Sequence, residues 1–290
     1  MLLKIDRKKK FFSVLLLILA SFFISIVPPV WKLRSGPLVI KSQYSQRIFS
    51  PDKKDWLDFD DVSRHLINAI LVAEDARFYE HLGLDFKEIY YSFRLNLKAK
   101  KIIRGASTIT QQVVKIAFLT PERSFLRKIR EAIGAILLEM ILSKDEIFSW
   151  YINIVEFGDG IAGVKNAARY YYNSPPDRLT IQEAVHLALV LPNPNSRSKE
   201  LKQNRLTDFG HRRYFQIVKR MFENGFINKR LMENALASGD FGRPIWPEQR
   251  IFSPHLQPKE KVATTTLKTL EPPPPIAFDQ APNLSPFPRK

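Results

Sequence analysis

A stretch of the chain that begins at Glu74 and ends at Glu131 combines acidic, amide, hydroxyl and cationic side chains between apolar runs. Such mixed segments depart from the sequence pattern of a simple apolar core, and departures of this kind are expected at functional sites. Glu74, Lys115 and the basic residues Arg123, Arg127 and Lys128 together fit one reaction. In it a carboxylate accepts a proton from a hydroxyl nucleophile, while cations hold a phosphorylated leaving group. Taken singly, each group is better explained as a helix cap, an amphipathic face or a surface ion pair.

Two predicted helices position these groups. Apolar residues recur at helical spacing from about Val62 onward, which places Glu74 at the end of an apolar helix. The next helix is predicted to begin near Ser107 or the residue after it. Ser107, Gln111 and Lys115 recur every fourth residue on one side of that helix, so they form a polar stripe with one cation.

The rest of the sequence is also typical of a mostly helical fold. Ser143 and Thr180 are each followed three residues later by Glu, which is the capping-box pattern of a helix start. The segment around Val39 and Ile40 fits either a short strand or an extended linker, and the sequence does not decide between them. Further helices are predicted over residues 124–142, 207–222 and 228–238.

An apolar segment near the N-terminus is predicted to be a membrane anchor. Three lysines precede an uncharged run from Phe11 to Val27, and interfacial residues extend it to Trp31. A cleaved signal peptide is the rival interpretation, although no clear cleavage site of small residues precedes Pro28. Because the basic residues lie before the segment, the N-terminus is predicted to be cytoplasmic and the remainder to lie outside.

These features divide the chain of 290 residues into five predicted segments. They are a cytoplasmic basic tail at 1–10, a transmembrane signal anchor at 11–31, a linker or start of a small lobe at 32–60, a main domain at 61–240 and a proline-rich, disordered tail at 241–290. The tail is assigned from its composition, since clustered prolines favour an extended chain.

The composition limits the class of function. Lys and Arg number 45 against 29 acidic residues, and the formal net charge of +16 indicates a polyanionic partner such as phosphate or anionic lipid. Nucleic acid is not an expected partner, because the predicted topology places the domain outside the cytoplasm. The histidines lack the ligand spacing of a zinc site, and the signatures of zinc proteases, serine hydrolases and nucleotide-binding loops are absent.

Five ordered segments resemble the motifs of one family. EDARFYEHLGLD, which starts at Glu74, resembles the first motif of the peptidoglycan glycosyltransferases, the transglycosylase domain of penicillin-binding proteins. RGASTITQQVVK, RKIRE, KDEIFSWYIN and, more weakly, GHRRYFQIVKRM resemble the second to fifth motifs. The resemblance covers roughly residues 60–225 and implies a lysozyme-like helical domain with a smaller lobe near the membrane. Because the chain ends where a bifunctional relative would continue into a penicillin-binding domain, a monofunctional enzyme is expected.

The resemblance implies that Glu74 is the general base of an inverting glycosyl transfer. The 4-hydroxyl of the acceptor's N-acetylglucosamine would attack the anomeric carbon of the donor's N-acetylmuramic acid. The leaving polyprenyl diphosphate needs cations more than a protonating acid. The expected partners are lipid II, the growing glycan strand and the membrane, with other cell-wall synthesis or division proteins beside them. The expected location is the bacterial inner membrane, crossed once, with the catalytic domain on the periplasmic side.

The same resemblance assigns roles to individual residues. Glu131 is expected to act with Glu74 in catalysis by orienting Lys115 and Arg123 or by helping to hold magnesium or manganese, and no organic cofactor is expected. Asp75 and His81 are expected to order the loop that carries Glu74. The expected substrate-binding residues, with Lys115 and Arg123 on the diphosphate, are Ser107, Gln111, Gln112, Lys115, Arg123 and Arg127.

Two other functions stay open at this point. In a lysozyme-like lytic enzyme, a Glu beside an apolar run has a raised pKa and acts as general acid. The cationic residues disfavour this reading, because cleavage between two sugars releases no diphosphate. A non-catalytic basic scaffold at the membrane would have its charges scattered over the surface, whereas several of them lie within the motifs.

Overall fold

Helices make up most of the chain that the computed structural model describes, which comprises residues 13, 27–41, 46–101, 105–122, 124–158 and 160–242. The prediction of a mostly helical fold is therefore confirmed. The described α-helices are α2 (Lys32–Ser35), α3 (Arg64–Glu74), α4 (Phe86–Ala99), α5 (Ile109–Phe118), α6 (Phe125–Ile141), α7 (Lys144–Ile154), α8 (Val164–Tyr172), α9 (Ile181–Val190), α10 (Pro194–Lys202), α11 (Asp208–Glu223) and α12 (Lys229–Ser238). Short 3-10 turns lie between them, namely η1 (Phe59–Asp61), η2 (Phe78–Glu80) and η3 (Pro176–Arg178).

Side-chain caps fix the helix starts that the sequence predicts. Ser143 with Glu146, and Thr180 with Glu183, each form both hydrogen bonds of a capping box, at the starts of α7 and α9. These helices begin where the patterns place them because a cap depends only on residues within one turn. At four other helices a hydroxyl accepts a first-turn N–H, and these N-cap residues are Ser63, Thr108, Ser124 and Thr207.

The segment around Val39, which the sequence left open, is a strand. β1 (Leu38–Lys41) pairs antiparallel with β2 (Gln46–Phe49), and Leu38 lies opposite Phe49. Leu38 and Ile40 are buried whereas Val39 is exposed, so alternate residues pack inward. The inward face lies against α5, which links this hairpin to the helical core.

The predicted membrane anchor at 11–31 lies largely outside the described residues. Within the part of the chain that is described, no helix combines the length and the apolar character needed to cross a bilayer. The proline-rich tail lies outside the description from residue 243 onward. Both predictions therefore stay untested.

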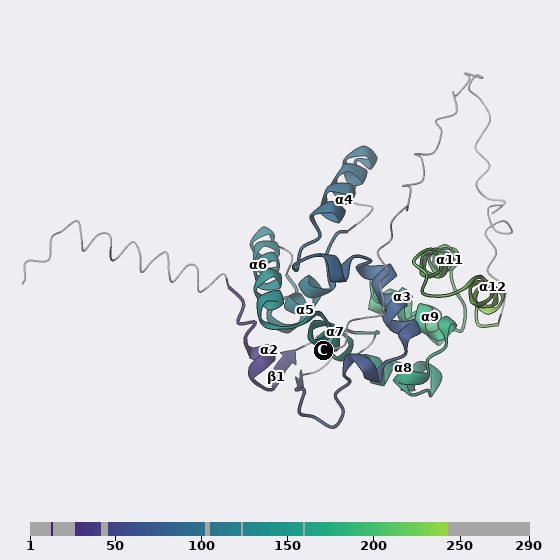
Figure 1. The fold of residues 1–290 in the computed structure, drawn as a ribbon, viewed down its shortest axis with the longest axis horizontal. Helices are drawn as coiled ribbons and strands as arrows, with labels where there is room; N and C mark the ends of the chain where they lie inside the picture. Colours follow the sequence, from purple (N-terminus) through teal and green to yellow (C-terminus); the bar gives the residue numbers. More distant parts are fainter. Residues whose placement is uncertain are drawn as a thin grey trace, which may run out of the picture. The chain divides into compact units, whose positions relative to one another are not determined.

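The helices pack in two neighbouring groups (Figure 1). α3 lies against α9 and α11, while α5 lies against α6 and α7. The aromatic residues Phe148, Trp150 and Tyr151 of α7 are buried at 2% exposure or less, which puts α7 at the centre of the core. This packing fixes the end of α3 beside the start of α5.

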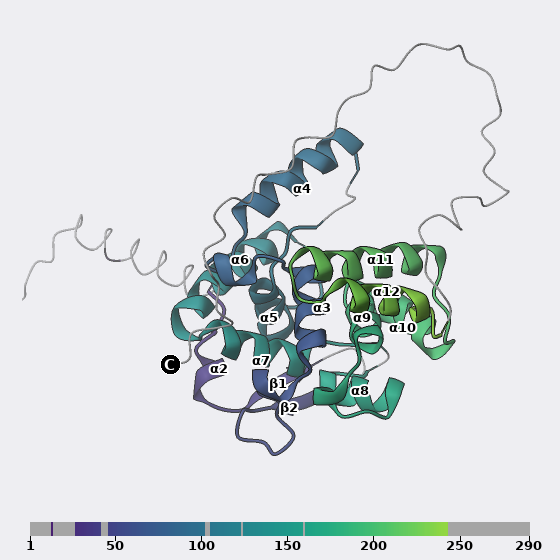
Figure 2. The same cartoon turned by 45° about the vertical axis from the view of Figure 1, so that its right-hand side comes forward.

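α4 stands apart from these groups. Figures 1 and 2 both show it extending away from α3, α5 and α6. Ser92 is the one buried residue of this fully described helix. Its exposed large apolar side chains are Phe86, Ile89, Tyr90, Tyr91, Phe93, Leu95 and Leu97.

Gly83 brings the loop after α3 against α6. Its φ is +83°, and a Cβ there would lie 2.7 Å from the carbonyl oxygen of Ala135. Its own carbonyl accepts a 2.7 Å hydrogen bond from Thr108 Oγ1. We expect Gly83→Ala to lower the free energy of unfolding by about 1–3 kcal/mol, measured as a lower midpoint in urea. The control is Gly105→Ala, where nothing lies within 4 Å of an added Cβ, and equal losses in both variants would contradict this account.

Candidate active site

Two arginines of α11 hold the end of α3. Arg213 Nη2 donates to the carbonyl oxygen of Ala73 at 2.7 Å, and Arg220 Nη1 donates to that of Val72 at 3.2 Å. The last carbonyls of a helix have no partner within it, so these bonds complete the final turn of α3. Glu74 is the last residue of that turn, and its position is therefore set from α11.

The half-buried carboxyl of Glu74 is also held from α5. Gln112 Nε2 donates to Glu74 Oε2 at 2.8 Å, and Gln112 Oε1 accepts from Tyr151 Oη at 3.5 Å. Burial raises the pKa of the Tyr151 phenol well above its usual value, so it stays a donor. The other carboxylate oxygen of Glu74 makes no hydrogen bond with a described residue. It is therefore the oxygen that is available to accept a proton.

Burial dominates the acid–base behaviour of Glu74. It raises the pKa of the carboxyl, and the charge of neighbouring Asp75 acts in the same direction. The hydrogen bond from Gln112 and the charges of Arg213 and Lys115 lower the pKa and so offset part of this rise. A carboxylate with a raised pKa is a stronger base than an ordinary surface carboxylate, which suits Glu74 to proton transfer.

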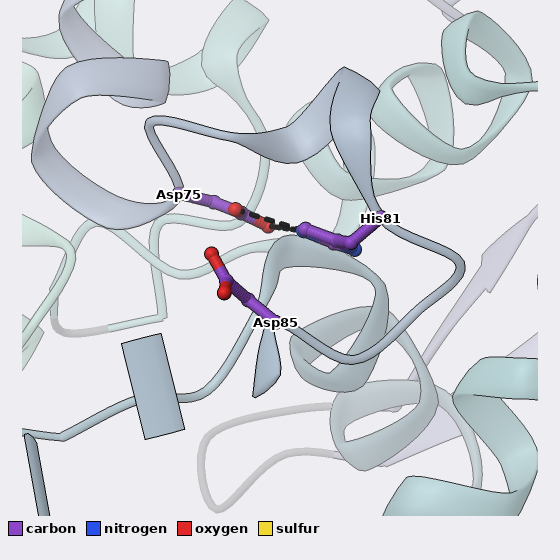
Figure 3. A group of neighbouring side chains, drawn as sticks. All are labelled: Asp75, His81 and Asp85. Carbon is purple, nitrogen blue, oxygen red and sulfur yellow. Dashed lines mark hydrogen bonds and ion pairs between the residues drawn. The ribbon is translucent and has the colours of Figure 1, made fainter. Parts of the chain in front are cut away.

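Asp75 and His81 order the loop that follows Glu74 (Figure 3). His81 Nε2 lies 3.0 and 3.1 Å from the two carboxylate oxygens of Asp75. Asp75 Oδ2 also accepts a 3.0 Å hydrogen bond from the backbone N–H of Ile109, the first residue of α5. Asp75 therefore ties the end of α3 to the start of α5, which agrees with the structural role expected for it.

Ser107, Arg127, Lys128 and Glu131 form a second polar group, the Glu131 cluster. Glu131 is 2% exposed, and its two oxygens pair with Lys128 Nζ and, at 3.4 Å, with Arg127 Nη1. Lys128 Nζ also donates to Ser107 Oγ at 2.9 Å. The buried carboxylate thus holds two cationic side chains at the surface of α6. They are not Lys115 and Arg123, the cations that Glu131 was expected to orient, so that role stays a prediction.

Lys115 is an exposed residue of α5. Partial desolvation lowers the pKa of its ammonium, and the charges of Glu131 and Glu74 counteract that effect by raising it. Lys115 therefore lies within electrostatic reach of both carboxylates. It makes no hydrogen bond or ion pair with any described residue, so its donors are available to a ligand.

The three residues of the predicted polar stripe, Ser107, Gln111 and Lys115, have different surroundings in the structure. Gln111 is 2% exposed, and its side chain accepts the backbone N–H of Thr108 at 3.0 Å in a capping box. Its amide thus closes the start of the helix, whereas the next residue, Gln112, reaches Glu74. Ser107 lies before the helix and joins the Glu131 cluster instead. Arg123 falls outside the described residues, so its role on the diphosphate stays a prediction.

Two groups of described side chains, one at Glu131 and one at Asp75, could supply ligands to a divalent ion. At Glu131 both oxygens already pair with cations, so an ion there would have to displace Arg127 or Lys128. Asp75, His81 and Asp85 place ligand atoms within 4.8 Å of one another (Figure 3), but the guanidinium of Arg77 already pairs with Asp85. At both places cationic side chains already pair with the carboxylates, and the prediction of magnesium or manganese stays untested.

Two residues of the site were not predicted from the sequence. Tyr151 lies in the segment that resembles the fourth motif, and Arg213 lies in the one that resembles the fifth, so each could have been sought within those motifs. Lys128, in contrast, belongs to the predicted basic patch beside Glu131, which it precedes by three residues, a spacing that brings side chains together on a helix.

Known proteins resemble the chain over this region. A family model described as Transglycosylase matches residues 41–222. A biosynthetic peptidoglycan transglycosylase of Dechloromonas aromatica is 42% identical over 142 residues, which cover 49% of this chain and 62% of that protein. The protein of that name from Nitrosomonas eutropha is 40% identical, over 48% of this chain and 57% of that protein. The one from Aeromonas hydrophila is 41% identical, over 58% of this chain and 70% of that protein. The chain thus spans less than two thirds of the first two relatives, while the family match covers most of its own length. The chain belongs to the transglycosylase family.

Proposed function

We propose that the chain is a peptidoglycan glycosyltransferase that polymerises glycan strands from lipid II. One observation carries the proposal: one carboxylate oxygen of half-buried Glu74 has no hydrogen bond with a described residue, and neither has the ammonium of Lys115 on α5, whose charge acts on Glu74. The Glu131 cluster, which acts on the same ammonium, adds further cations. The name shared by the relatives, biosynthetic peptidoglycan transglycosylase, supports the same activity.

The proposed reaction is a single displacement. Glu74 accepts the proton of the acceptor's 4-hydroxyl as that oxygen forms a bond to the donor's anomeric carbon. The bond from this carbon to the diphosphate oxygen breaks on the opposite face, so the configuration inverts. The electron pair of that bond leaves with the diphosphate, and Lys115, Arg127 and Lys128 offset the developing negative charge. No second carboxylic acid is required, because a diphosphate leaves as an anion.

A polymerisation assay tests this function. The purified full chain in detergent is given lipid-linked disaccharide pentapeptide and, separately, preformed glycan. Formation of new glycan polymer supports the proposal. Shortening of the preformed glycan without polymer formation would instead support a lytic enzyme, in which the raised pKa makes Glu74 a general acid.

The pH profile should depend on Gln112. Its hydrogen bond lowers the pKa of Glu74, so Gln112→Ala should raise that pKa further. Because the base acts in its deprotonated form, the acidic limb of kcat/KM should then move to higher pH. Gln203→Ala, at the exposed end of α10, makes the same chemical change away from Glu74 and is the control. An unmoved acidic limb in Gln112→Ala would contradict the assignment of Glu74 as base.

α4 gives the proposed enzyme a surface for the bilayer. Phe86, Tyr90, Phe93 and Leu97 follow one side of the helix, and they are between 55% and 72% exposed. Lys87, Arg94 and Lys98 add positive charge to the same helix, which suits anionic lipid headgroups. We assign α4 to the smaller lobe that was expected near the membrane. The anchor at 11–31, the single crossing and the periplasmic location belong to the same proposal.

The absence of cysteine permits a direct test of this surface. An environment-sensitive fluorophore attached at Phe93→Cys in the full chain, reconstituted in vesicles, should shift to the blue and be quenched by lipids that carry a quencher. The matched site is Phe226→Cys, an exposed aromatic residue far along the chain, where neither change is expected. Equal spectra and equal quenching at both sites would exclude α4 as the membrane surface.

A further inference from the structure

A hollow of about 610 Å³ opens between β2, α8 and the loop that joins α7 to α8. Arg47 comes from β2, and residues 160–161 come from the loop. The amide side chains of Asn166 and Asn173, with Arg169 and Tyr170 between them, come from α8 and its C-cap. The proposed glycosyl transfer uses none of these residues.

The hollow carries positive charge that the described residues do not balance. Arg47 Nη2 donates to the carbonyl oxygen of Gly160, which uses one of the five N–H groups of its guanidinium. Arg169 is exposed and makes no hydrogen bond or ion pair with a described residue. None of the described residues that line the hollow is acidic. Two guanidinium groups therefore face a shared space, and such groups bind carboxylates through paired N–H donors.

The side of α8 that lines the hollow also suits a sugar. Asn166, Arg169, Tyr170 and Asn173 follow the spacing of a single helix face, while the opposite side of α8 is buried. Tyr170 is 59% exposed, and Lys202 Nζ lies 6.0 Å from the centre of its ring. An exposed aromatic ring flanked by amides gives a sugar an apolar surface together with hydrogen-bonding groups.

The hollow lies away from α4. Figures 1 and 2 differ by a rotation about the vertical axis, and in both α4 is at the top and α8 at the bottom. The hollow therefore does not belong to the α4 surface.

We infer that the Arg47–Arg169 hollow binds the glycan product through the carboxylates of its peptide substituents, with Tyr170 against a sugar ring. This inference rests on the proposed function, because that function supplies a glycan whose acidic peptides extend from the membrane. It adds a product-holding site distinct from the site around Glu74.

Binding of glycan oligomers tests the inference. Isothermal titration of the full chain in detergent would use oligomers that carry peptides and the same oligomers after the peptides are removed by an amidase. Arg169→Gln, and separately Arg47→Gln, should weaken binding of the peptide-bearing oligomers about tenfold, as expected for the loss of one charged hydrogen-bonding group. The matched control is Arg178→Gln, which removes the same charge from a 78% exposed side chain outside the hollow and should bind like wild type.

Several results would overturn the inference. One is an unchanged Kd in both Arg169→Gln and Arg47→Gln, and another is an equal loss in Arg178→Gln. A third is binding of anionic vesicles that depends on Arg169 while glycan binding does not, which would assign the hollow to lipid. Polymer formation by the wild-type chain is scored separately. A chain that polymerises but binds oligomers independently of Arg169 would defeat only this inference, and one that binds them through Arg169 without polymerising would defeat only the proposed function.

Discussion

Glu74→Gln should reduce kcat/KM for glycan polymerisation by about 10²–10⁴-fold, the usual contribution of a positioned general base. The amide has the shape of the carboxyl and can still accept the 2.8 Å hydrogen bond from Gln112 Nε2 through its oxygen. It cannot accept a proton at neutral pH. Because the carboxyl is half-buried and its pKa is raised, replacing it should not lower the thermal midpoint of unfolding at neutral pH. The variant should therefore lose activity without losing stability.

Glu80→Gln is the matched control for Glu74→Gln. Glu80 lies in the same motif, six residues along the chain, but it is exposed at the end of η2. Its removal should leave the rate of polymerisation within about twofold of wild type, since surface changes away from a site have small effects. Full activity in Glu74→Gln, or an equal loss in both variants, would remove Glu74 from the mechanism.

Lys115→Gln should reduce kcat by about 10²–10³-fold, the range seen when one preorganised donor to a developing negative charge is removed. Lys115 is the described cation that lies within electrostatic reach of both Glu74 and Glu131 and has no hydrogen bond or ion pair of its own. Its charge is therefore free to respond to the diphosphate as the bond to the sugar breaks. Steady-state kinetics over a range of substrate concentrations would separate kcat from KM.

The control for Lys115 is Lys229→Gln on α12. The side chain of Lys229 is 76% exposed and faces Glu233 at 3.8 Å, so the variant loses the same charge away from the site. It should retain the kinetics of wild type. A rise in KM with unchanged kcat in Lys115→Gln would show that Lys115 binds the ground state and the transition state equally, contrary to the proposed role.

Local patterns predicted the helices well, and the physical reason is the short range of caps. Ser124 and Thr207 each accept an N–H three residues ahead, so the sequence near each helix start contains the whole signal. The position of Glu74 at the end of an apolar helix followed from the same kind of pattern. The contacts of Glu131 can also be predicted from sequence spacing. Arg127 and Lys128 precede Glu131 by four and three residues, and side chains at these spacings meet on a helix.

Contacts between segments that are distant in the sequence could not be predicted from local patterns. Spacing alone put Gln111 on the polar stripe, but the direction of that stripe depends on how α5 packs against α3, α6 and α7. As a result Gln111 closes a cap, and Gln112 reaches Glu74. Arg213 supports α3 from 140 residues away in sequence, a relation that no local period records. The prediction that the fold is mostly helical, in contrast, needed only the helical pattern, whereas the lysozyme-like class came from the family resemblance.

The most direct measurement counts products. The full chain would be given lipid-linked disaccharide pentapeptide with a label in the lipid and another in the sugar, and both released carrier and new glycosidic bonds would be counted over time. The account predicts one polyprenyl diphosphate released for each bond formed, with both falling together in Glu74→Gln. Release of carrier without new bonds, or shortening of existing glycan with no carrier released, would contradict glycosyl transfer from a diphosphate-linked donor.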